Sequence, residues 1–252
     1  MHLLETKDLG IVFGGLQALN DLHLVVDAKE IVGLIGPNGA GKTTVFNLLT
    51  GVYAPSGGAI RLEGQSILGK KPFQINRTGV ARTFQNIRLF KHMTVADNIK
   101  LAMNQNMKYN VVSGMLRLPS YWKEERAIDR KARELLAIFD MEDLADQMSA
   151  NLPYGQQRKL EILRALASKP KLLLLDEPAA GMNPTETHDL MEVIRSIRDR
   201  FNVAILLIEH DMSLVMNVCE RLYVLDYGNL IAEGTPEEIR NNDKVIAAYL
   251  GS

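Results

Sequence analysis

The sequence predicts an α/β fold, in which a mostly parallel sheet is joined by an antiparallel β part and an inserted helical segment. Short apolar runs at Ile31–Ile35, Leu172–Leu175 and Ile205–Ile208 are typical of parallel strands that are covered on both faces. Residues 1–30 alternate apolar and polar side chains, as an antiparallel sheet does. Residues 94–150 are expected to be mainly helical, with helical apolar spacing from Glu124 to Phe139, and they interrupt the alternation of strands and helices.

The chain has 252 residues, of which 46% are hydrophobic, so one domain with a full core is expected. We expect the antiparallel β part at 1–30 and about 57–65, because a Gly-Gly turn precedes a second alternating run. The α/β core is expected at 31–92 and 155–252, with the helical part at 94–150 between its two halves.

A glycine-rich loop follows the first apolar strand and fits the pattern G-x-x-x-x-G-K-[ST]. A helix is predicted after it, from Thr44 to Leu49. Backbone N–H groups of such a loop point inward, and the helix N-terminus adds partial positive charge, so the loop suits phosphate. Lys42 would reach the β- and γ-phosphates, and the Thr43 hydroxyl would ligate Mg²⁺. The predicted nucleotide-binding residues are Gly36, Pro37, Asn38, Gly39, Ala40, Gly41, Lys42, Thr43 and Thr44.

Two carboxylates end the strand predicted at Leu172–Leu175, at Asp176 and Glu177. Ligands of open α/β sheets bind at the carboxyl ends of strands, so both acids are expected beside the phosphate loop. Asp176 suits the outer shell of Mg²⁺, where it would act through water. Glu177 could polarise the water that attacks the γ-phosphate.

A histidine, His210, follows the predicted strand at Ile205–Ile208. Neutral imidazole both donates and accepts a hydrogen bond, so this residue could contact the γ-phosphate. A lone histidine at a strand end is more often incidental. His210 becomes a candidate because its strand is expected beside that of Asp176.

At this point the chain resembles the ATP-binding cassette (ABC) ATPases over essentially its whole length. GPNGAGKTT resembles their Walker A motif, LLLLDEP their Walker B motif and LPYGQ their signature. The resemblance implies that Gln85 is the Q-loop glutamine, a catalytic residue that also binds Mg²⁺, and that His210 is the switch histidine. It also implies that Phe13 stacks on adenine. The signature, which meets the ATP of a partner subunit, would comprise Leu152, Pro153, Tyr154, Gly155 and Gln156.

Three longer segments are similar to one subgroup, the ATPase subunits of branched-chain amino acid importers. These are ARTFQNIRLFKHMTVADNI, YGQQRKLEI and LLLLDEPAAGMNPTE. Two positions depart from the general pattern. Pro153 stands where the signature usually has a serine, so the signature must use Gly155, Gln156 and the helix dipole. Asn183 stands where an aspartate is usual, and it is predicted to cap a helix with Pro184 at its first position.

Composition limits the remaining function classes. The net charge of −1 gives no electrostatic case for nucleic acid. The single cysteine, Cys219, excludes a disulfide framework and is best explained as a packing thiol. The first ten residues are charged too early for a signal peptide, and no apolar run approaches the roughly 18 residues of a membrane span. We therefore expect a cytoplasmic protein, held at the inner face of the membrane by partners.

Two function classes remain: the ATP-hydrolysing motor of an importer, and a soluble cassette protein acting on DNA, ribosomes or iron–sulfur assembly. The second class usually has fused cassettes, coiled-coil insertions or basic extensions, none of which occurs in this sequence. A GTPase is disfavoured because no N/T-K-x-D motif follows the phosphate loop. A transporter for another solute, or an exporter, stays open, because the solute would contact other subunits.

The resemblance also implies partners. Two membrane permease subunits and, indirectly, a solute-binding protein are expected, together with a second ABC ATPase. The subgroup typically pairs two different cassettes, and a signature without its hydroxyl is easier to tolerate opposite a complete one. We therefore expect a heterodimer with unequal sites, and a homodimer is the alternative.

Overall fold

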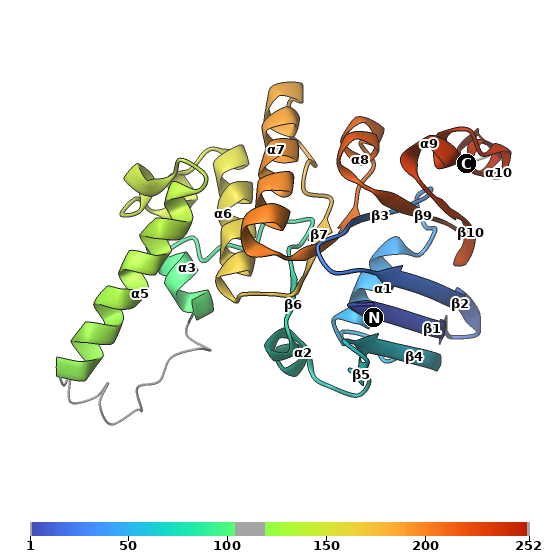
Figure 1. Ribbon diagram of the computed structural model, residues 1–252, viewed down its shortest axis with the longest axis horizontal. Helices are drawn as coiled ribbons and strands as arrows, with labels where there is room; N and C mark the ends of the chain where they lie inside the picture. Colours follow the sequence, from blue (N-terminus) through green and yellow to red (C-terminus); the bar gives the residue numbers. More distant parts are fainter. Residues whose placement is uncertain (1, 104–118, 251–252) are drawn as a thin grey trace. The chain divides into compact units, whose positions relative to one another are not determined.

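The computed structural model describes residues 2–103 and 119–250 (Figure 1). The chain divides into two compact units. The first unit combines residues 1–85 with 170–252, and the second unit comprises 86–169.

One sheet of the first unit is antiparallel, with strand order β2-β1-β4-β5. Leu4 of β1 pairs with Val26 of β2 on one side and with Leu62 of β4 on the other. Buried and exposed residues alternate in β1 from Leu4 to Lys7, and the alternation ends after that, where the pairing of β1 with β2 shifts register. The strands are β1 (Leu4–Phe13), β2 (Leu16–Val26), β4 (Gly57–Leu62) and β5 (Gln65–Ser66).

The other sheet has six strands in the order β10-β9-β3-β8-β7-β6. Every neighbouring pair is parallel except β9 and β10, which are antiparallel. All five residues of β3 are buried, as are those of β7 and β8, which is why these sequences are apolar except for Asp176 at the end of β7. The strands are β3 (Ile31–Ile35), β6 (Val80–Arg82), β7 (Leu172–Asp176), β8 (Ala204–Ile208), β9 (Arg221–Asp226) and β10 (Asn229–Gly234).

Helices of the first unit begin with local signals that the sequence carries. Asn183 accepts hydrogen bonds from the N–H groups of Thr185 and Glu186 at the start of α7, which confirms the predicted cap. Helix α8 lies beside α7 (Figure 1). The helices are α1 (Lys42–Leu49), α2 (Pro72–Thr78), α7 (Pro184–Phe201), α8 (Met212–Val218), α9 (Pro236–Arg240) and α10 (Asp243–Leu250).

A continuous hydrophobic core connects the two sheets of the first unit. It contains Leu9 and Leu22 of the antiparallel sheet, Phe46 of α1, and Leu34 and Leu206 of the parallel sheet, all fully buried. Helix α1 therefore packs between the sheets, and the loop that precedes it has rigid neighbours on both sides.

The second unit is helical in its described part, with α3 (Val95–Met103), α5 (Pro119–Ala137) and α6 (Tyr154–Ala167) in mutual contact. From the sequence we expect the core to resume at 155, whereas α6 packs against α3 and α5 in this unit. Residues 104–118, in which an irregular segment is expected, lie outside the described residues. Within the part of the chain that the structure describes, no helix is long and apolar enough to cross a membrane.

Candidate active site

Four neighbouring parallel strands, β3, β8, β7 and β6, end at one edge of the six-stranded sheet. Each is followed at that edge by candidate residues. The phosphate loop follows β3, His210 follows β8, Glu177 follows β7, and Gln85 follows β6. The strand order therefore brings together four groups that are as far as 174 residues apart in the sequence (Gly36 to His210).

The loop from Gly36 to Gly41 connects β3 to α1, and its glycines are sterically required. Gly36 has φ 147°, and a Cβ atom there would lie 2.0 Å from the Leu225 carbonyl oxygen. Gly41 caps α1 with φ 105°, in the left-handed region that favours glycine. The first turn of α1 contains no acidic residue, so nothing offsets the positive end of its dipole.

Lys42 lies inside this loop, with only 6% of its surface exposed. Its Nζ donates to the carbonyl oxygens of Gly36 at 2.6 Å and Pro37 at 2.9 Å. Burial lowers the pKa of Lys42, and the negative charge of Glu177 acts in the opposite direction. Thr43 is exposed beside it, as are Asn38 and Gly39, so the loop offers a hydroxyl, backbone groups and an ammonium at one place.

Glu177 is held by two other predicted site residues. Its Oε2 accepts from Gln85 Nε2 at 2.6 Å, and its Oε1 contacts His210 Nε2 at 2.9 Å. Because a carboxylate can only accept, the imidazole carries a proton on Nε2 in this contact. The backbone of Glu177 has φ 46°, an uncommon value for a residue with a side chain, and its N–H donates to the Ile208 carbonyl. This turn directs Glu177 differently from Asp176.

Asp176 ends β7 and is buried. Its Oδ2 accepts from Arg82 Nη2 at 2.7 Å, and its N–H donates to the Thr83 hydroxyl at 3.3 Å. Sequence reasoning identified Asp176 but not Arg82 or Thr83. Both partners come from the end of β6, which pairs with β7 although about 90 residues separate the two strands.

Glu209, another residue that sequence reasoning gave no role, connects two loops of the site. It is buried, and its carboxylate accepts from the N–H groups of Ala179 at 2.6 Å, His210 at 2.9 Å and Asp211 at 3.3 Å. Burial raises the pKa of Glu209, whereas these N–H donors act to lower it. Glu209 thereby joins the loop after Glu177 to the loop that carries His210.

Phe13 lies at the end of β1 with 42% of its surface exposed. Tyr53 meets its ring edge-to-face, with the ring centroids 5.2 Å apart and the planes at 73°. An exposed ring of this kind offers a surface on which a base can stack.

The predicted signature lies in the second unit, at the start of α6. Pro153 occupies the N-cap position, where no side chain accepts a hydrogen bond from the helix. Tyr154 and Gly155 form the exposed and half-buried first turn, and Gln157 Nε2 donates to the Leu152 carbonyl at 2.8 Å. The N-terminus of α6 thus keeps the positive end of its dipole, without a serine hydroxyl beside it.

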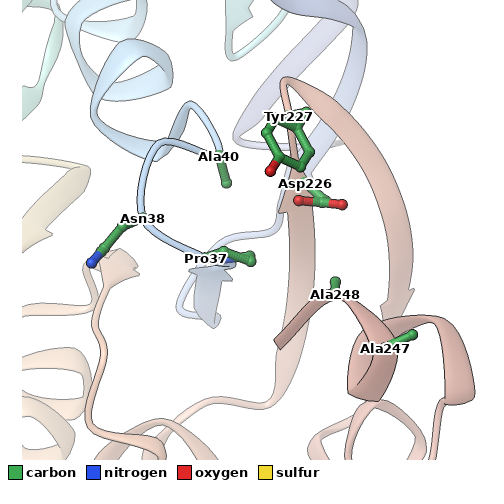
Figure 2. Close-up of a pocket in the computed structure, with 7 residues that line it drawn as sticks. All are labelled: Pro37, Asn38, Ala40, Asp226, Tyr227, Ala247 and Ala248. Carbon is green, nitrogen blue, oxygen red and sulfur yellow. The ribbon is translucent and has the colours of Figure 1, made fainter. Parts of the chain in front are cut away.

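A small pocket of about 150 Å³ lies between the phosphate loop and the C-terminal helix. Figure 2 shows Pro37 and Ala40 of the loop facing it from one side, and Ala248 of α10 from the other. Its volume is below the roughly 300 Å³ of typical ligand pockets. The Tyr249 side chain of α10 hydrogen-bonds the backbone of Gly36, and burial raises the pKa of its hydroxyl. Helix α10 therefore contacts the phosphate loop through this hydrogen bond.

The residues at this edge fit Mg²⁺ by their donor chemistry. The Thr43 hydroxyl, the Asp176 carboxylate and the Gln85 amide all offer oxygen, which is the ligand that Mg²⁺ prefers. Among the described residues, no group of three or more histidine, cysteine, aspartate or glutamate side chains could hold a metal. A metal here would therefore depend on nucleotide phosphates for much of its coordination.

Comparison with known proteins decides the family. A profile described as "ABC transporter" matches residues 19–180, and one described as "Branched-chain amino acid ATP-binding cassette transporter" matches 229–252. The chain belongs to the ABC transporter family. Its predicted resemblance to ABC ATPases is confirmed, and so is the predicted fold class.

Several relatives of this ABC ATPase are similar over nearly their whole length. The high-affinity branched-chain amino acid transport ATP-binding protein LivG of Escherichia coli K12 is 51% identical, across 99% of this chain and 98% of LivG. BraF of Pseudomonas aeruginosa, which carries the same description, is 48% identical with the same coverage. The lipopolysaccharide export protein LptB of E. coli K12 is 36% identical, over 100% of this chain and 98% of LptB.

Solved structures agree with the sequence relatives. The ADP conformation of MJ1267, an ATP-binding cassette of an ABC transporter, has a TM-score of 0.86 with 31% identity, and each chain covers 100% of the other. A nucleotide-free ATP-binding cassette has a TM-score of 0.85 with 32% identity over the same coverage.

Proposed function

We propose that this ABC ATPase is the ATP-hydrolysing subunit of an importer for branched-chain amino acids. ATPase activity of the ABC type follows from the family. The observation that carries the catalytic assignment is the pair of hydrogen bonds that holds both oxygens of Glu177. The solute is supported by LivG and BraF, and by the C-terminal match to the branched-chain amino acid family at 229–252.

In this proposal the triphosphate of ATP occupies the loop from Gly36 to Gly41. Lys42 moves its ammonium from the loop carbonyls to the β- and γ-phosphates, which are stronger acceptors. Thr43, Gln85 and, through water, Asp176 would hold Mg²⁺. When bound, that ion would neutralise negative charge on the phosphates. Phe13 stacks on the adenine.

Glu177 acts as the general base in this proposal. Gln85 and His210 fix its carboxylate in one orientation, so that an oxygen can accept a proton from the attacking water at small entropic cost. His210 shares its Nε2 proton with Glu177, and this proton could turn to the γ-phosphate once ATP is bound. His210 would therefore link the presence of the γ-phosphate to the position of the base.

The signature from Leu152 to Gln156 would cover ATP bound to a second ABC ATPase subunit. Backbone N–H groups of the first turn of α6 would contact that γ-phosphate, because Pro153 supplies no hydroxyl. We propose a heterodimer, since a signature without its serine is easier to tolerate when the signature of the second subunit is complete. The pair would attach to two membrane permeases, served by a solute-binding protein, at the cytoplasmic face of the membrane.

An exporter is the second transport class to consider, because LptB also matches the full length of the chain. Its identity of 36% is lower than the 51% of LivG. The C-terminal match names the branched-chain amino acid cassettes and lies in the segment that contains α10. These observations favour the importer.

A reconstituted complex tests the proposal. This chain is co-purified with its candidate permeases and sister ATPase, and ATP hydrolysis is measured with a solute-binding protein that is empty, loaded with leucine, or loaded with glutamate. We expect leucine loading to stimulate hydrolysis and glutamate loading not to do so. Equal stimulation by both solutes would contradict the assignment of the solute, and no hydrolysis in any condition would contradict the motor role.

A further inference from the structure

Arg82 is the last residue of β6, and its guanidinium hydrogen-bonds to β7 and to the C-terminal part of α1. Nη2 donates to Asp176 Oδ2 at 2.7 Å, at the end of β7. Nη1 donates to Asn47 Oδ1 at 2.8 Å and lies 3.4 Å from Thr50 Oγ1, both on the α1 side. One side chain therefore connects the carboxylate of Asp176 to the helix that follows the phosphate loop.

Two aromatic rings fix the plane of this guanidinium. Its Cζ lies 5.4 Å from the centre of the Phe46 ring and 5.1 Å from that of Phe84. Both distances are within the range of cation–π contact. Phe46 belongs to α1 and Phe84 precedes Gln85 directly, so the same group also contacts the start of the glutamine loop.

Stability alone does not explain this arrangement. The side chains of Arg82 and Asp176 are 7% and 5% exposed, so both charges have lost most of their hydration. Arg82 Nε is buried and has no hydrogen-bond partner among the described residues. A buried ion pair commonly adds less stability than an apolar pair of similar size, so its retention needs another reason.

We propose that Arg82 is a positioning residue for Asp176. It holds the Asp176 carboxylate at a fixed position relative to α1. This inference rests on the proposed role of Asp176 toward Mg²⁺. Arg82 donates to Oδ2, and the Thr83 hydroxyl accepts from the Asp176 N–H, so one carboxylate oxygen and the backbone of Asp176 are both held in place. Asn47 belongs to α1, and α1 begins at the phosphate loop. The contact of Arg82 with Asn47 would therefore set the distance between Asp176 and the phosphate loop.

The alternative is that Arg82 only balances the buried charge of Asp176. In that case any cation at position 82 would serve, and the contact with Asn47 would be dispensable. The positioning role instead requires a guanidinium, because its two terminal nitrogens reach Asn47 and Asp176 separately from one rigid plane, whereas the single nitrogen of an ammonium cannot reproduce that spacing.

The test uses the full-length chain and compares ATP affinity in Mg²⁺ with ATP affinity in EDTA, both by calorimetry. Arg82→Lys keeps the charge but removes the fork, and Asn47→Ala keeps the ion pair but removes its connection to α1. Outer-shell partners of metal ligands typically contribute about 10–100-fold in metal affinity or activity. We expect Arg82→Lys to reduce the gain in affinity from Mg²⁺ by about 10-fold or more, and Asn47→Ala to reduce it in the same direction.

Affinity in EDTA should stay within about 3-fold of wild type in both variants, since the phosphate loop is intact. The matched control is Arg77→Lys on α2, whose guanidinium stacks on Phe73 outside the site. If Arg82→Lys does not fold, Asn47→Ala still decides, because Asn47 is half-buried and outside the ion pair.

The positioning role would be overturned if Asn47→Ala gained as much ATP affinity from Mg²⁺ as the wild type does. It would also be overturned if the variants lost ATP affinity equally in Mg²⁺ and in EDTA. If the wild-type chain itself gains no ATP affinity from Mg²⁺, the failure lies with the proposed metal site rather than with Arg82.

Discussion

Replacing Glu177 with glutamine removes one charge and leaves the size of the side chain almost unchanged. In the wild-type site, the two oxygens of Glu177 accept from Gln85 and from His210. A glutamine offers one carbonyl oxygen and one NH₂ group, so only one of these donors keeps its acceptor. The substitution therefore removes the proton acceptor and loosens the two residues that orient it.

The expected loss of turnover follows from the general-base role. Positioned bases contribute about 10²–10⁴-fold, so Glu177→Gln should slow hydrolysis by at least about 100-fold. That loss corresponds to about 2.7 kcal/mol of transition-state stabilisation, at roughly 1.36 kcal/mol for each tenfold change. ATP affinity should be kept or improved, because a negative charge close to the triphosphate is removed.

Folding should change little in the same variant. The Glu177 side chain is only 16% exposed, so removing its charge relieves a desolvation cost that offsets the lost hydrogen bonds. We expect a change within about 1 kcal/mol in the free energy of unfolding, or about 2–4 °C in Tm for a chain of this size.

The assay is steady-state hydrolysis by the assembled complex, together with nucleotide binding and thermal unfolding of the purified chain. Glu192→Gln serves as the matched control, since Glu192 is an exposed carboxylate of α7 that pairs with Arg195. Turnover of Glu177→Gln above about one third of wild type would refute the general-base assignment, whatever happens to binding.

Three further predictions address binding, pH and the partner site. Lys42→Ala should lower Mg-ATP affinity steeply with Tm nearly unchanged; equal affinity by calorimetry would exclude its phosphate role. Burial raises the pKa of Glu209 above its ordinary value of 4.5. The folded chain therefore binds the extra proton, and this group's contribution to the free energy of unfolding should fall as pH rises from 4.5 through the raised pKa. Denaturant titrations at several pH values should show that Glu209→Gln loses this pH dependence of the free energy of unfolding. An unchanged pH dependence would contradict the prediction. Pro153→Ser should tighten ATP on the sister subunit only, and tighter binding at Lys42 would count against the shared site.

Much of the site could be predicted because its signals are local in sequence. The phosphate loop has fixed spacing, and Asp176 and Glu177 directly follow a buried apolar run. The helix cap at Asn183 was predicted correctly for the same reason, since a cap and its helix are neighbours in the chain. Helix α1 begins at Lys42, two residues before the predicted start, because the loop curls directly into its first turn.

What the sequence did not reveal depends on strand order. Arg82 and Glu209 are charged residues, and their partners become visible only once β6 lies beside β7 and β7 lies beside β8. Likewise, α6 begins within the signature, yet it groups with α3 and α5, because it contacts those helices. No local pattern states which distant element covers a helix face. A search for buried arginines next to predicted catalytic strands could have flagged Arg82.

The central claim, that hydrolysis at Glu177 drives branched-chain amino acid import, is tested most directly by uptake into sealed vesicles. The complete complex is reconstituted with this chain facing an ATP-containing lumen, and leucine-loaded binding protein is added outside. We predict ATP-dependent leucine accumulation that Glu177→Gln reduces by at least about 100-fold in initial rate, in line with its loss of turnover. Leucine accumulation at the wild-type rate with Glu177→Gln, or none with the wild-type chain while ATP is hydrolysed, would contradict the claim.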